Sequence, residues 1–515
     1  MRYESVIGLE IHIQLKTKTK MFCGCPTHDS AVAPNTNICP ICLGHPGVLP
    51  SVNEQAIHYG IRMGLAINCS IADHSKFDRK NYFYPDLPKA YQISQFDLPI
   101  AIDGHMDIVV PGGKREVARI GITRAHLEED AAKNVHGDDG STFVDFNRGG
   151  TPLIEIVTEP DFRTPAETKI FLQELRLIAR YLGVSSADME KGHLRCDANI
   201  SMRRFDENDK QVDPGLNPKT EVKNLNSFRH VERALEHEIQ RQTKLWEAET
   251  PPMESTTRGW DDAKGVTTQQ RSKEGAADYR YFPEPDIPPL ALADIAEQER
   301  QHMPELPAAK RARFESEFAL RPSDARQMCD EPILADFAEH VFSELHAWLD
   351  SLDNVEDINI EKGKLGKLVS SWLLSRLGGL LAERSIDIRL VPTDTGSGYA
   401  GKISPENFAE FITLVATRKL NNAGGLKVLG LMLDGDDDDP SHIMEEQQLG
   451  RMEDEGAMAD IVMRVLESHP DEVARYKAGE EQLLKFLIGM VMKASEGTAD
   501  AAMAKNMLLV ELKAE

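Results

Sequence analysis

The chain has 515 residues, with 59 Lys and Arg against 84 Asp and Glu, so its net charge is −25. This length predicts more than one domain, because single cores stop growing at about 250–300 residues. The acidity excludes a protein that grips nucleic acid over its whole surface, so any RNA contact is expected to be local.

Targeting and membrane signals are absent from the sequence pattern. No stretch approaches the roughly 20 consecutive apolar residues that a membrane helix needs. The N-terminal residues Met1 to Ser5 enter a strand-like pattern at once, so we expect no signal peptide. A cytoplasmic protein without a membrane span is the plain interpretation.

The first predicted element is a strand over residues 6–15, where apolar and polar side chains alternate cleanly. Glu10 and His12 lie on its polar face, two residues and roughly 7 Å apart. A carboxylate beside a histidine suits a metal site. For this strand alone, the water-facing side of an antiparallel sheet is the simpler interpretation.

Four of the seven cysteines crowd into twenty residues, as Cys-x-Cys and Cys-x-x-Cys separated by thirteen residues. Clustered cysteines in a cytoplasmic chain favour metal over disulfides. Four thiolates on two tight knuckles predict a closed, structural zinc site. The alternative is four unmetallated thiols left close together. The cluster consists of Cys23, Cys25, Cys39 and Cys42.

Residues 76–85 interleave basic and aromatic side chains around Lys80. This pattern suits a nucleotide held by charge and stacking. The alternative is an aromatic core segment with solvated lysines.

Further carboxylates lie on later predicted strands. Glu155 stands at the centre of the apolar strand 153–157, and a buried carboxylate is costly unless it is paired or metal-bound. Residues 194–201 alternate again, and His126 to Asp130 add an acidic turn. Several carboxylates with a histidine are what a Mg²⁺–phosphate site needs. The polar face of the strand 194–201 carries Arg195, Asp197 and Asn199.

Helices interrupt the strand-rich region at two places. Thr164 to Glu167 form a capping box with proline at the first helical position, opening a helix that runs through Tyr181 and is closed by Gly183. A second helix begins after Ser227. Prolines gather in residues 250–300 and suggest a boundary, beyond which the pattern becomes helical. A second break is expected over residues 392–401, and the run Asp436 to Asp439 reads as a solvated loop.

Familiar nucleotide-binding and hydrolase motifs are missing. The sequence has no Gly-x-x-x-x-Gly-Lys-Ser/Thr phosphate loop and no dinucleotide-binding glycine fingerprint. It also has no Gly/Ser-rich amidase signature and no Gly-x-Ser-x-Gly elbow. ATP would therefore be held by a sheet, a metal and basic residues, and hydrolysis of an amide donor is not expected in this chain.

Several of these segments resemble, in order and spacing, the signature segments of the GatB family. Residues 486–489 with 493–495 also resemble the end of that family's tail domain. The matching N-terminal segments are residues 6–12, 76–85, 89–95, 126–130, 148–155, 194–201 and 278–286.

The resemblance implies an α+β fold in three parts. A mainly antiparallel β cradle over residues 1–292, similar to the catalytic fold of glutamine synthetase, would carry the zinc knuckles at 23–42. A helical domain over 293–400 and a helical tail similar to YqeY proteins over 401–515 would follow. The tail would contact tRNA, although residues 401–515 hold 12 Lys and Arg against 22 Asp and Glu, which excludes a broad basic face.

The implied activity is that of a tRNA-dependent amidotransferase, a carbon–nitrogen ligase with glutamine as the amide donor. ATP would phosphorylate the side-chain carboxylate of Asp-tRNA(Asn), Glu-tRNA(Gln) or both. Ammonia from a partner glutaminase would then displace the phosphate. The implied partners are the GatA and GatC subunits and the misacylated tRNA, and the implied cofactors are ATP, Mg²⁺ and structural Zn²⁺.

By the same resemblance, the Mg²⁺ ligands are His12, Glu129 and Glu155, and Glu10 and Asp197 are nearby acidic partners. Adjacent residues on a strand point to opposite faces, so Glu128 stays open as the alternative to Glu129. The residues expected to support phosphate or substrate are Lys80, Arg195 and Asn199.

Two other classes of protein compete with this interpretation. A zinc-bearing RNA-binding scaffold explains the cysteines and the tail, but it does not explain a carboxylate inside an apolar strand. An amide ligase acting on a free amino acid explains the carboxylates, but it has no need of the C-terminal helical region.

Overall fold

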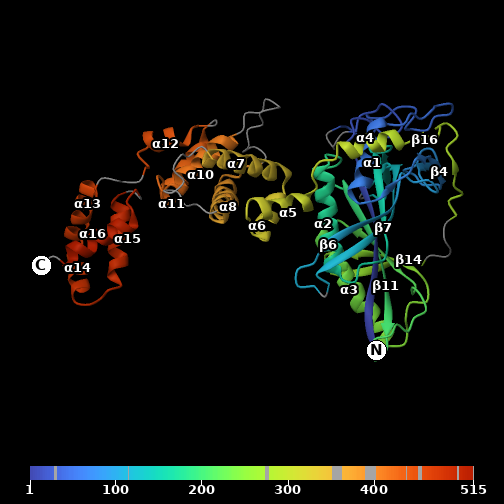
Figure 1. Cartoon of the computed structure of the whole chain (residues 1–515). Coiled ribbons are helices and arrows are strands. Elements are labelled where there is room, and N and C mark those ends of the chain that lie inside the picture. Colours follow the sequence, from blue (N-terminus) through green and yellow to red (C-terminus); the bar gives the residue numbers. More distant parts are fainter. Residues whose placement is uncertain are drawn as a thin grey trace. The chain divides into compact units, whose positions relative to one another are not determined.

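The alternating N-terminal segment forms the central strand of a nine-stranded sheet (Figure 1). In this computed structural model, β1 (Arg2–Gln14) lies between β10 (Pro152–Thr158) and β11 (Leu194–Phe205) and is antiparallel to both. The strand order is β14-β13-β12-β11-β1-β10-β7-β6-β2, and β12 and β13 form its parallel pair. The expected mainly antiparallel β region is therefore confirmed.

The other strands of this sheet come from both halves of the first 300 residues. The segment 250–300, which we expected to be a boundary, supplies two of them, since its prolines fall outside β13 and β14. The other strands are β2 (Ser70–Ile71), β6 (Ala101–Val109), β7 (Val117–Glu129), β12 (Thr220–Leu225), β13 (Thr256–Asp261) and β14 (Val266–Ser272).

Three smaller sheets flank the large one. The first has the order β15-β4-β5 and carries the basic and aromatic segment. The others are the pairs β16–β3 and β8–β9. Their strands are β3 (His74–Ser75), β4 (Asp78–Asn81), β5 (Tyr91–Ser94), β8 (Lys133–His136), β9 (Thr142–Asp145), β15 (Phe282–Pro283) and β16 (Leu290–Ala291).

Helices α1 (Glu54–Ala66), α2 (Pro165–Tyr181) and α3 (Phe228–Glu247) pack against the sheet and bury the apolar face of β1. The expected capping box begins α2: the Thr164 hydroxyl accepts from the Glu167 N–H, and the Glu167 carboxylate accepts from the Thr164 N–H. Gly183, with φ +66°, follows its end, and the Ser227 side chain caps α3. With one face of the sheet covered, the polar side chains of β1 are left on the other.

The structure describes residues 1–27, 32–113, 115–137, 139–272, 278–350, 362–388, 402–435, 438–450, 455–495 and 498–513. The chain divides into two compact units, Met1–Pro307 and Ala308–Glu515. Helix α4 (Ala293–Gln301), which we expected to begin the helical domain, belongs to the first unit. Its Glu299 accepts a hydrogen bond from Arg62 of α1 at 2.6 Å and lies 2.7 Å from His58 Nδ1.

The second unit is built from helices. Phe337 of α7 packs on Phe408 of α10, with ring centroids 5.6 Å apart, so residues on both sides of the expected boundary at 400 share a core. The expected break at 392–401 and residues 436–437 of the acidic run lie outside the described residues. The helices are α5 (Pro307–Glu317), α6 (Pro322–Cys329), α7 (Pro332–Asp350), α8 (Lys362–Ser370), η2 (Ser371–Leu377), α9 (Gly378–Arg384), α10 (Pro405–Ala416), α11 (Asn422–Asp434), α12 (Pro440–Glu446), α13 (Glu455–Ser468), α14 (Pro470–Lys477), α15 (Leu483–Ala494) and α16 (Ala501–Lys513).

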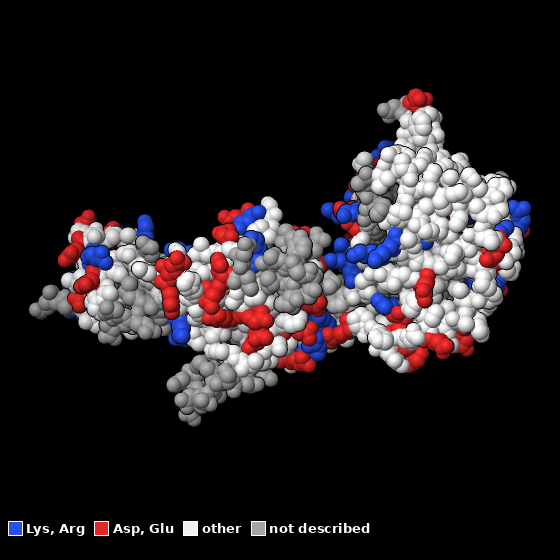
Figure 2. Space-filling model, turned by 90° about the horizontal axis from the view of Figure 1, so that it is seen from above, with Lys and Arg blue, Asp and Glu red and all other residues white. Residues whose placement is uncertain are grey.

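The last four helices, α13 to α16, have a hydrophobic cluster of their own, centred on Val462, Leu487 and Leu508. On the face that Figure 2 shows, Lys and Arg of the described helical residues are interspersed with Asp and Glu and form no continuous basic surface. None of the helices described is long and apolar enough to cross a membrane.

Candidate active site

The register of the three central strands brings the expected acidic residues onto one face of the sheet. His12 of β1 lies opposite Glu155 of β10 on one side and opposite Arg195 of β11 on the other. Glu10 lies opposite Asp197. Because paired residues in a sheet project from the same face, these side chains converge on the face that the helices leave open.

Two groups of potential metal ligands form there, and both contain Glu155. In each group the ligand atoms lie within 4.8 Å of one another. His12 Nε2 is 3.3 Å from Glu155 Oε2 and 3.4 Å from Glu128 Oε1, and His126 Nε2 is 3.5 Å from Glu155 Oε2. The first group is Glu10, His12 and Glu155, and the second is His126, Glu128 and Glu155.

Glu128 and Glu129 occupy opposite faces of β7. Glu128 is 3% exposed, faces His12, and accepts a hydrogen bond from Ser94. Glu129 is not brought to His12 and Glu155. Its carboxylate instead pairs with Lys89 at 2.5 Å and accepts from the Ile93 N–H. The geometry therefore joins Glu128, not Glu129, to the other acidic residues.

Burial and close contacts set the charges of this cluster. Burial opposes protonation of His12, but hydrogen bonds with Glu128 and Glu155 raise its pKa to about 10. Burial likewise opposes ionisation of Glu128, whose contacts with His12 and His126 hold its pKa well below the ordinary value. Burial and the charge of Glu155 raise the pKa of Glu10. The site thus holds the cationic imidazole of His12 beside anionic carboxylates. A divalent cation bound there would supply the positive charge in place of the imidazole proton.

Lys80 of β4 approaches the cluster from the small sheet β15-β4-β5. Burial opposes its charge, but attraction by Glu128 and other anions raises its pKa. Its Nζ lies 5.0 Å from the ring centroid of Tyr279 and 5.9 Å from that of Tyr82. This basic and aromatic segment therefore borders the site and is not merely core packing.

Arg195 and Asp197 are held by charged neighbours. Arg195 Nη2 donates to Asp130 Oδ2 at 2.9 Å. Lys223 of β12 donates to Asp197 Oδ2 at 2.7 Å and lies 3.2 Å from Glu221 Oε1. Burial opposes the charge of Lys223, but Asp197 raises its pKa. Cationic groups thus line the site beside its carboxylates.

Asn199 lies opposite Gly8, one pair beyond Glu10 and Asp197 on the same face. Its Oδ1 is buried and has no hydrogen-bond partner among the described residues. It borders a cavity of about 630 Å³ whose wall also includes Glu10, Thr158, Leu216 and Met253. The cavity thus starts beside Glu10 of the first metal-ligand group and extends along the open face of the sheet, away from His12.

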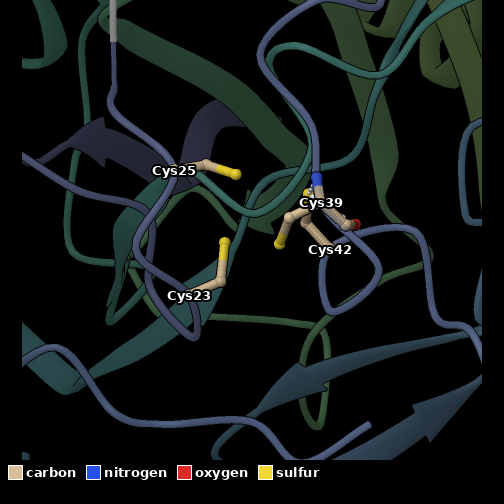
Figure 3. A group of neighbouring side chains, drawn as sticks. All are labelled: Cys23, Cys25, Cys39 and Cys42. Carbon is tan, nitrogen blue, oxygen red and sulfur yellow. Dashed lines mark hydrogen bonds between the residues drawn. The ribbon is translucent and has the colours of Figure 1, made fainter.

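The four clustered cysteines converge, as Figure 3 shows. Their Sγ atoms all lie within 4.8 Å of one another. A tetrahedral site with Zn–S bonds of about 2.3 Å needs sulfur atoms about 3.8 Å apart, so the arrangement fits zinc. The hydrogen bond with the Cys23 thiol lowers the pKa of Cys42 to about 4 against the opposing effect of burial, while burial raises the pKa of Cys25 to about 11. Without a cation, the four thiols cannot all ionise together.

The local chain geometry suits such knuckles. Leu43 and Gly44 donate to the carbonyls of Cys39 and Ile41 and close a tight turn, and the Cys39 N–H points to Cys42 Sγ at 3.2 Å. Gly44 has φ +68°, and a β-carbon there would collide with Lys89. Only glycine therefore suits this corner of the second knuckle.

Two residues of the site were missed from the sequence. His126 was noted only as part of an acidic turn, although its spacing of two from Glu128 places both on one face of a strand. Lys223 was missed because residues 220–225 alternate without an apolar run that marks them as central. The predicted residues that the structure does bring to one face are Glu10, His12, Glu155, Arg195, Asp197 and Asn199, with Lys80 at its border.

Comparison with protein families gives two matches. A family model described as "GatB/GatE catalytic domain" matches residues 5–297, and one described as "GatB domain" matches residues 353–512. Together they cover most of the chain, and the first contains every residue of the candidate site.

Curated proteins match over nearly the full length. A protein of Dehalococcoides mccartyi is 44% identical over 512 residues, which is 98% of each chain. Proteins of Thermodesulfovibrio yellowstonii and Thermotoga maritima are each 42% identical, over 100% of both chains in each comparison. All three are named as a subunit of an aspartyl/glutamyl-tRNA(Asn/Gln) amidotransferase.

Proposed function

The chain belongs to the GatB family, and on that premise we propose that it is the subunit of a tRNA-dependent amidotransferase that activates a misplaced amino acid on its tRNA. Its substrates are ATP and Asp-tRNA(Asn), Glu-tRNA(Gln) or both. The observation that carries this proposal is the cluster of buried carboxylates and histidines on the open face of the sheet. A scaffold without chemistry has no use for charges that are costly to bury.

The chemistry follows from the substrate. A side-chain carboxylate does not react with ammonia, because its oxygen is a poor leaving group. Transfer of the γ-phosphoryl group of ATP to that oxygen gives an acyl phosphate and ADP. Ammonia then attacks the carbonyl carbon, the C–O bond to phosphate breaks, and the proton that the nitrogen loses passes to the departing phosphate, which gives the amide and inorganic phosphate.

The residues of this face suit a Mg²⁺ site for the first step. His12, Glu155 and Glu128 would hold the ion, with Glu10 and His126 beside them, because hard carboxylate oxygens match its preferences. We prefer Glu128 to Glu129 because Glu129 is engaged by Lys89 on the other face. When bound, Mg²⁺ offsets the charge on the transferring phosphoryl group.

Basic and polar residues around the cluster would hold the nucleotide and the substrate. Lys80 and Arg195 are placed to attract phosphate oxygens. The wall of the cavity begins at Glu10, and the pair Gly8–Asn199 lies four residues along β1 from His12, or about 13 Å, a distance that suits the nucleoside of an extended ATP molecule. The amide oxygen of Asn199, to which no described residue donates, would accept a hydrogen bond from the amino group of adenine.

The cysteine cluster would hold one structural zinc ion. All four positions around the ion are filled by Cys23, Cys25, Cys39 and Cys42, so none is left for substrate. We expect about one equivalent of zinc in the purified chain, and less than roughly a third of an equivalent would refute the site.

The name of the relatives implies a complex of several subunits. We propose GatA and GatC as partners, with GatA supplying ammonia from glutamine. Two of the three cysteines outside the zinc site are not activated for that reaction. Burial raises the pKa of Cys69 to about 12, and burial raises that of Cys196 well above the ordinary value. Both thiols are therefore inert.

The experiment that tests the proposal is ATP hydrolysis by the assembled complex in the presence of misacylated tRNA and absence of an ammonia source. Hydrolysis that depends on Asp-tRNA(Asn) or Glu-tRNA(Gln) supports activation of the carboxylate. Hydrolysis with free Asp or Glu alone would support an amide ligase of small molecules instead, and no hydrolysis with any of them would support a scaffold. Using both misacylated tRNAs also determines which one the chain accepts.

A further inference from the structure

Lys20 is a fully buried lysine beside the cysteine cluster, with 1% of its surface exposed. Its ammonium group donates to the Asn37 carbonyl at 3.0 Å, to the Phe146 carbonyl at 3.3 Å and to Cys42 Sγ at 3.7 Å. An ammonium group has three N–H donors, so these three acceptors satisfy it completely.

The charge of Lys20 needs a nearby anion, because an unpaired buried ammonium is very costly. Among the residues that the structure describes, its hydrogen-bond partners include no carboxylate, and the sulfur of Cys42 is its one acidic partner. Four thiolates around one Zn²⁺ carry a net charge of −2. The lysine is therefore placed to neutralise half of that charge from outside the coordination shell.

Lys20 also joins the two knuckles to each other. The backbone N–H of Lys20 donates to the Cys25 carbonyl at 2.8 Å, in the first knuckle, while its side chain reaches Cys42 in the second. Asn37, whose carbonyl accepts from Lys20, donates its side-chain amide to the Pro26 carbonyl. Loss of the ammonium group would release the contacts with Cys42 and the Asn37 carbonyl, while the backbone contact with Cys25 would stay in place.

A further contact links the metal site to the start of β10, the strand that carries Glu155. The Phe146 carbonyl and Gly150 belong to the loop before that strand. A β-carbon on Gly150 would lie 3.4 Å from Lys20 Cδ, and the Gly150 carbonyl accepts from the Met21 N–H at 2.7 Å. Asn147 Oδ1 of the same loop accepts from the Asn37 N–H at 2.8 Å. The lysine side chain thus lies between the cysteines and this loop.

We propose that Lys20 is the counter-cation of the zinc knuckles and a positioning residue that ties the bound ion to the loop 146–150 leading into β10. Residues that hydrogen-bond to the ligands of a metal both stabilise an anionic complex and orient those ligands. The inference rests on the zinc site proposed above.

The experiment compares Lys20→Met with Lys18→Met, an exposed lysine two residues earlier, in the full chain. Zinc release to a chromogenic chelator should be about tenfold or more faster in Lys20→Met and close to wild type in Lys18→Met. Hydrogen exchange of residues 146–150 should rise in the zinc-loaded Lys20→Met protein.

Thermal unfolding with and without zinc distinguishes the proposed role of Lys20 as counter-cation from a general role in the stability of the fold. Lys20→Met should destabilise the zinc-loaded chain more than the zinc-stripped chain, because four thiolates around Zn²⁺ leave a net charge of −2 beside the ammonium group, whereas the stripped site cannot ionise all four thiols. Equal destabilisation in both states, or zinc release within about twofold of wild type, would overturn the proposal.

Further controls distinguish failure of the zinc site from failure of the role proposed for Lys20. Wild-type protein that holds no zinc would refute the zinc site itself, whereas normal zinc content with unchanged release refutes only the role of Lys20. If Lys20→Met does not fold, Lys20→Gln keeps N–H donors without the charge and should release zinc faster in the same way. Slow release in that variant would likewise overturn the proposal.

Discussion

His12 and Glu155 face each other across β1 and β10, with Nε2 of the imidazole 3.3 Å from Oε2 of the carboxylate. The two residues come from distant parts of the chain and meet only because the strands pair in this register. Their contact defines the centre of the candidate metal site, and the other acidic residues are arranged around it.

Removing either partner should abolish amidation without loss of tRNA binding. We expect His12→Ala and Glu155→Gln to slow amide formation by about 100-fold or more, because the stabilisation of developing charge by a metal is worth several kcal/mol. The dissociation constant for tRNA should change by less than roughly threefold. Asp107→Asn, which alters an exposed carboxylate on β6, is the control and should leave both quantities unchanged. A parallel loss of tRNA affinity would contradict a separate metal site.

Glu128 and Glu129 should differ in their effect on metal binding. Glu128→Gln should weaken Mn²⁺ binding, used as a spectroscopic substitute for Mg²⁺, by roughly tenfold, because it removes an anionic ligand. Glu129→Gln should leave Mn²⁺ affinity within about twofold, since Glu129 pairs with Lys89 on the other face. Electron paramagnetic resonance titration measures both. The reverse order of effects would restore Glu129 as the ligand.

The last four helices should be separable from the catalytic unit. We expect deletion of residues 455–515 to weaken tRNA binding while leaving Mn²⁺ affinity at its wild-type value, because α13 to α16 have their own hydrophobic cluster. Deletion from residue 405 onwards should instead destabilise the remaining helical unit, because it removes Phe408 from its contact with Phe337. Filter binding and circular dichroism distinguish the two truncations. Unchanged tRNA affinity after the shorter deletion would exclude α13 to α16 from tRNA recognition.

The isolated chain should use ammonium but not glutamine. With ATP and a high ammonium concentration, it should convert misacylated tRNA slowly but measurably, because the acyl phosphate needs only ammonia at close range. With glutamine alone it should form no product until GatA and GatC are added, since a glutaminase needs an activated nucleophile. Chromatography of the amino acid released from the tRNA measures the product. Glutamine-dependent product from the pure chain would reveal a nucleophile among its residues.

Glu238 of α3 should make stability depend on pH. Burial opposes its ionisation, but hydrogen bonds from Arg241 and Thr267 hold its pKa below the ordinary value. A carboxylate with a lowered folded pKa stabilises the fold fully above its unfolded pKa, and this stabilisation is lost as pH falls through the folded pKa.

Glu238→Gln should therefore lower the free energy of unfolding by about 3 kcal/mol at pH 7, and the gap from wild type should shrink below about pH 4. Glu236→Gln, on the exposed side of the same helix, should show little change at either pH. Thermal unfolding, with hydrogen exchange followed over α3, provides the measurement. A gap that persists on acidification would show that the charge of Glu238 contributes nothing.

Alternation in the sequence predicted which side chains of β1 and β11 share a face, because the period of a strand is two. It did not predict which strands pair, since register depends on contacts between distant segments. For the same reason the sequence left the choice between Glu128 and Glu129 open, because the pairing of β7 with β10 decides it. The contact between Phe337 and Phe408 was missed because an apolar stripe on a helix does not predict which other helix packs against it.

The location of the site within the strands, rather than in loops, has a consequence for how the gene can change. Deleting the codon for Leu9, inside β1, would shift every later side chain of the strand to the opposite face. His12 would then point into the helix-covered core, and Ile11 and Ile13 would point to the open face that carries the candidate site. A substitution changes one side chain of this active site, but a single-residue deletion there would exchange the polar and apolar faces of the rest of the strand.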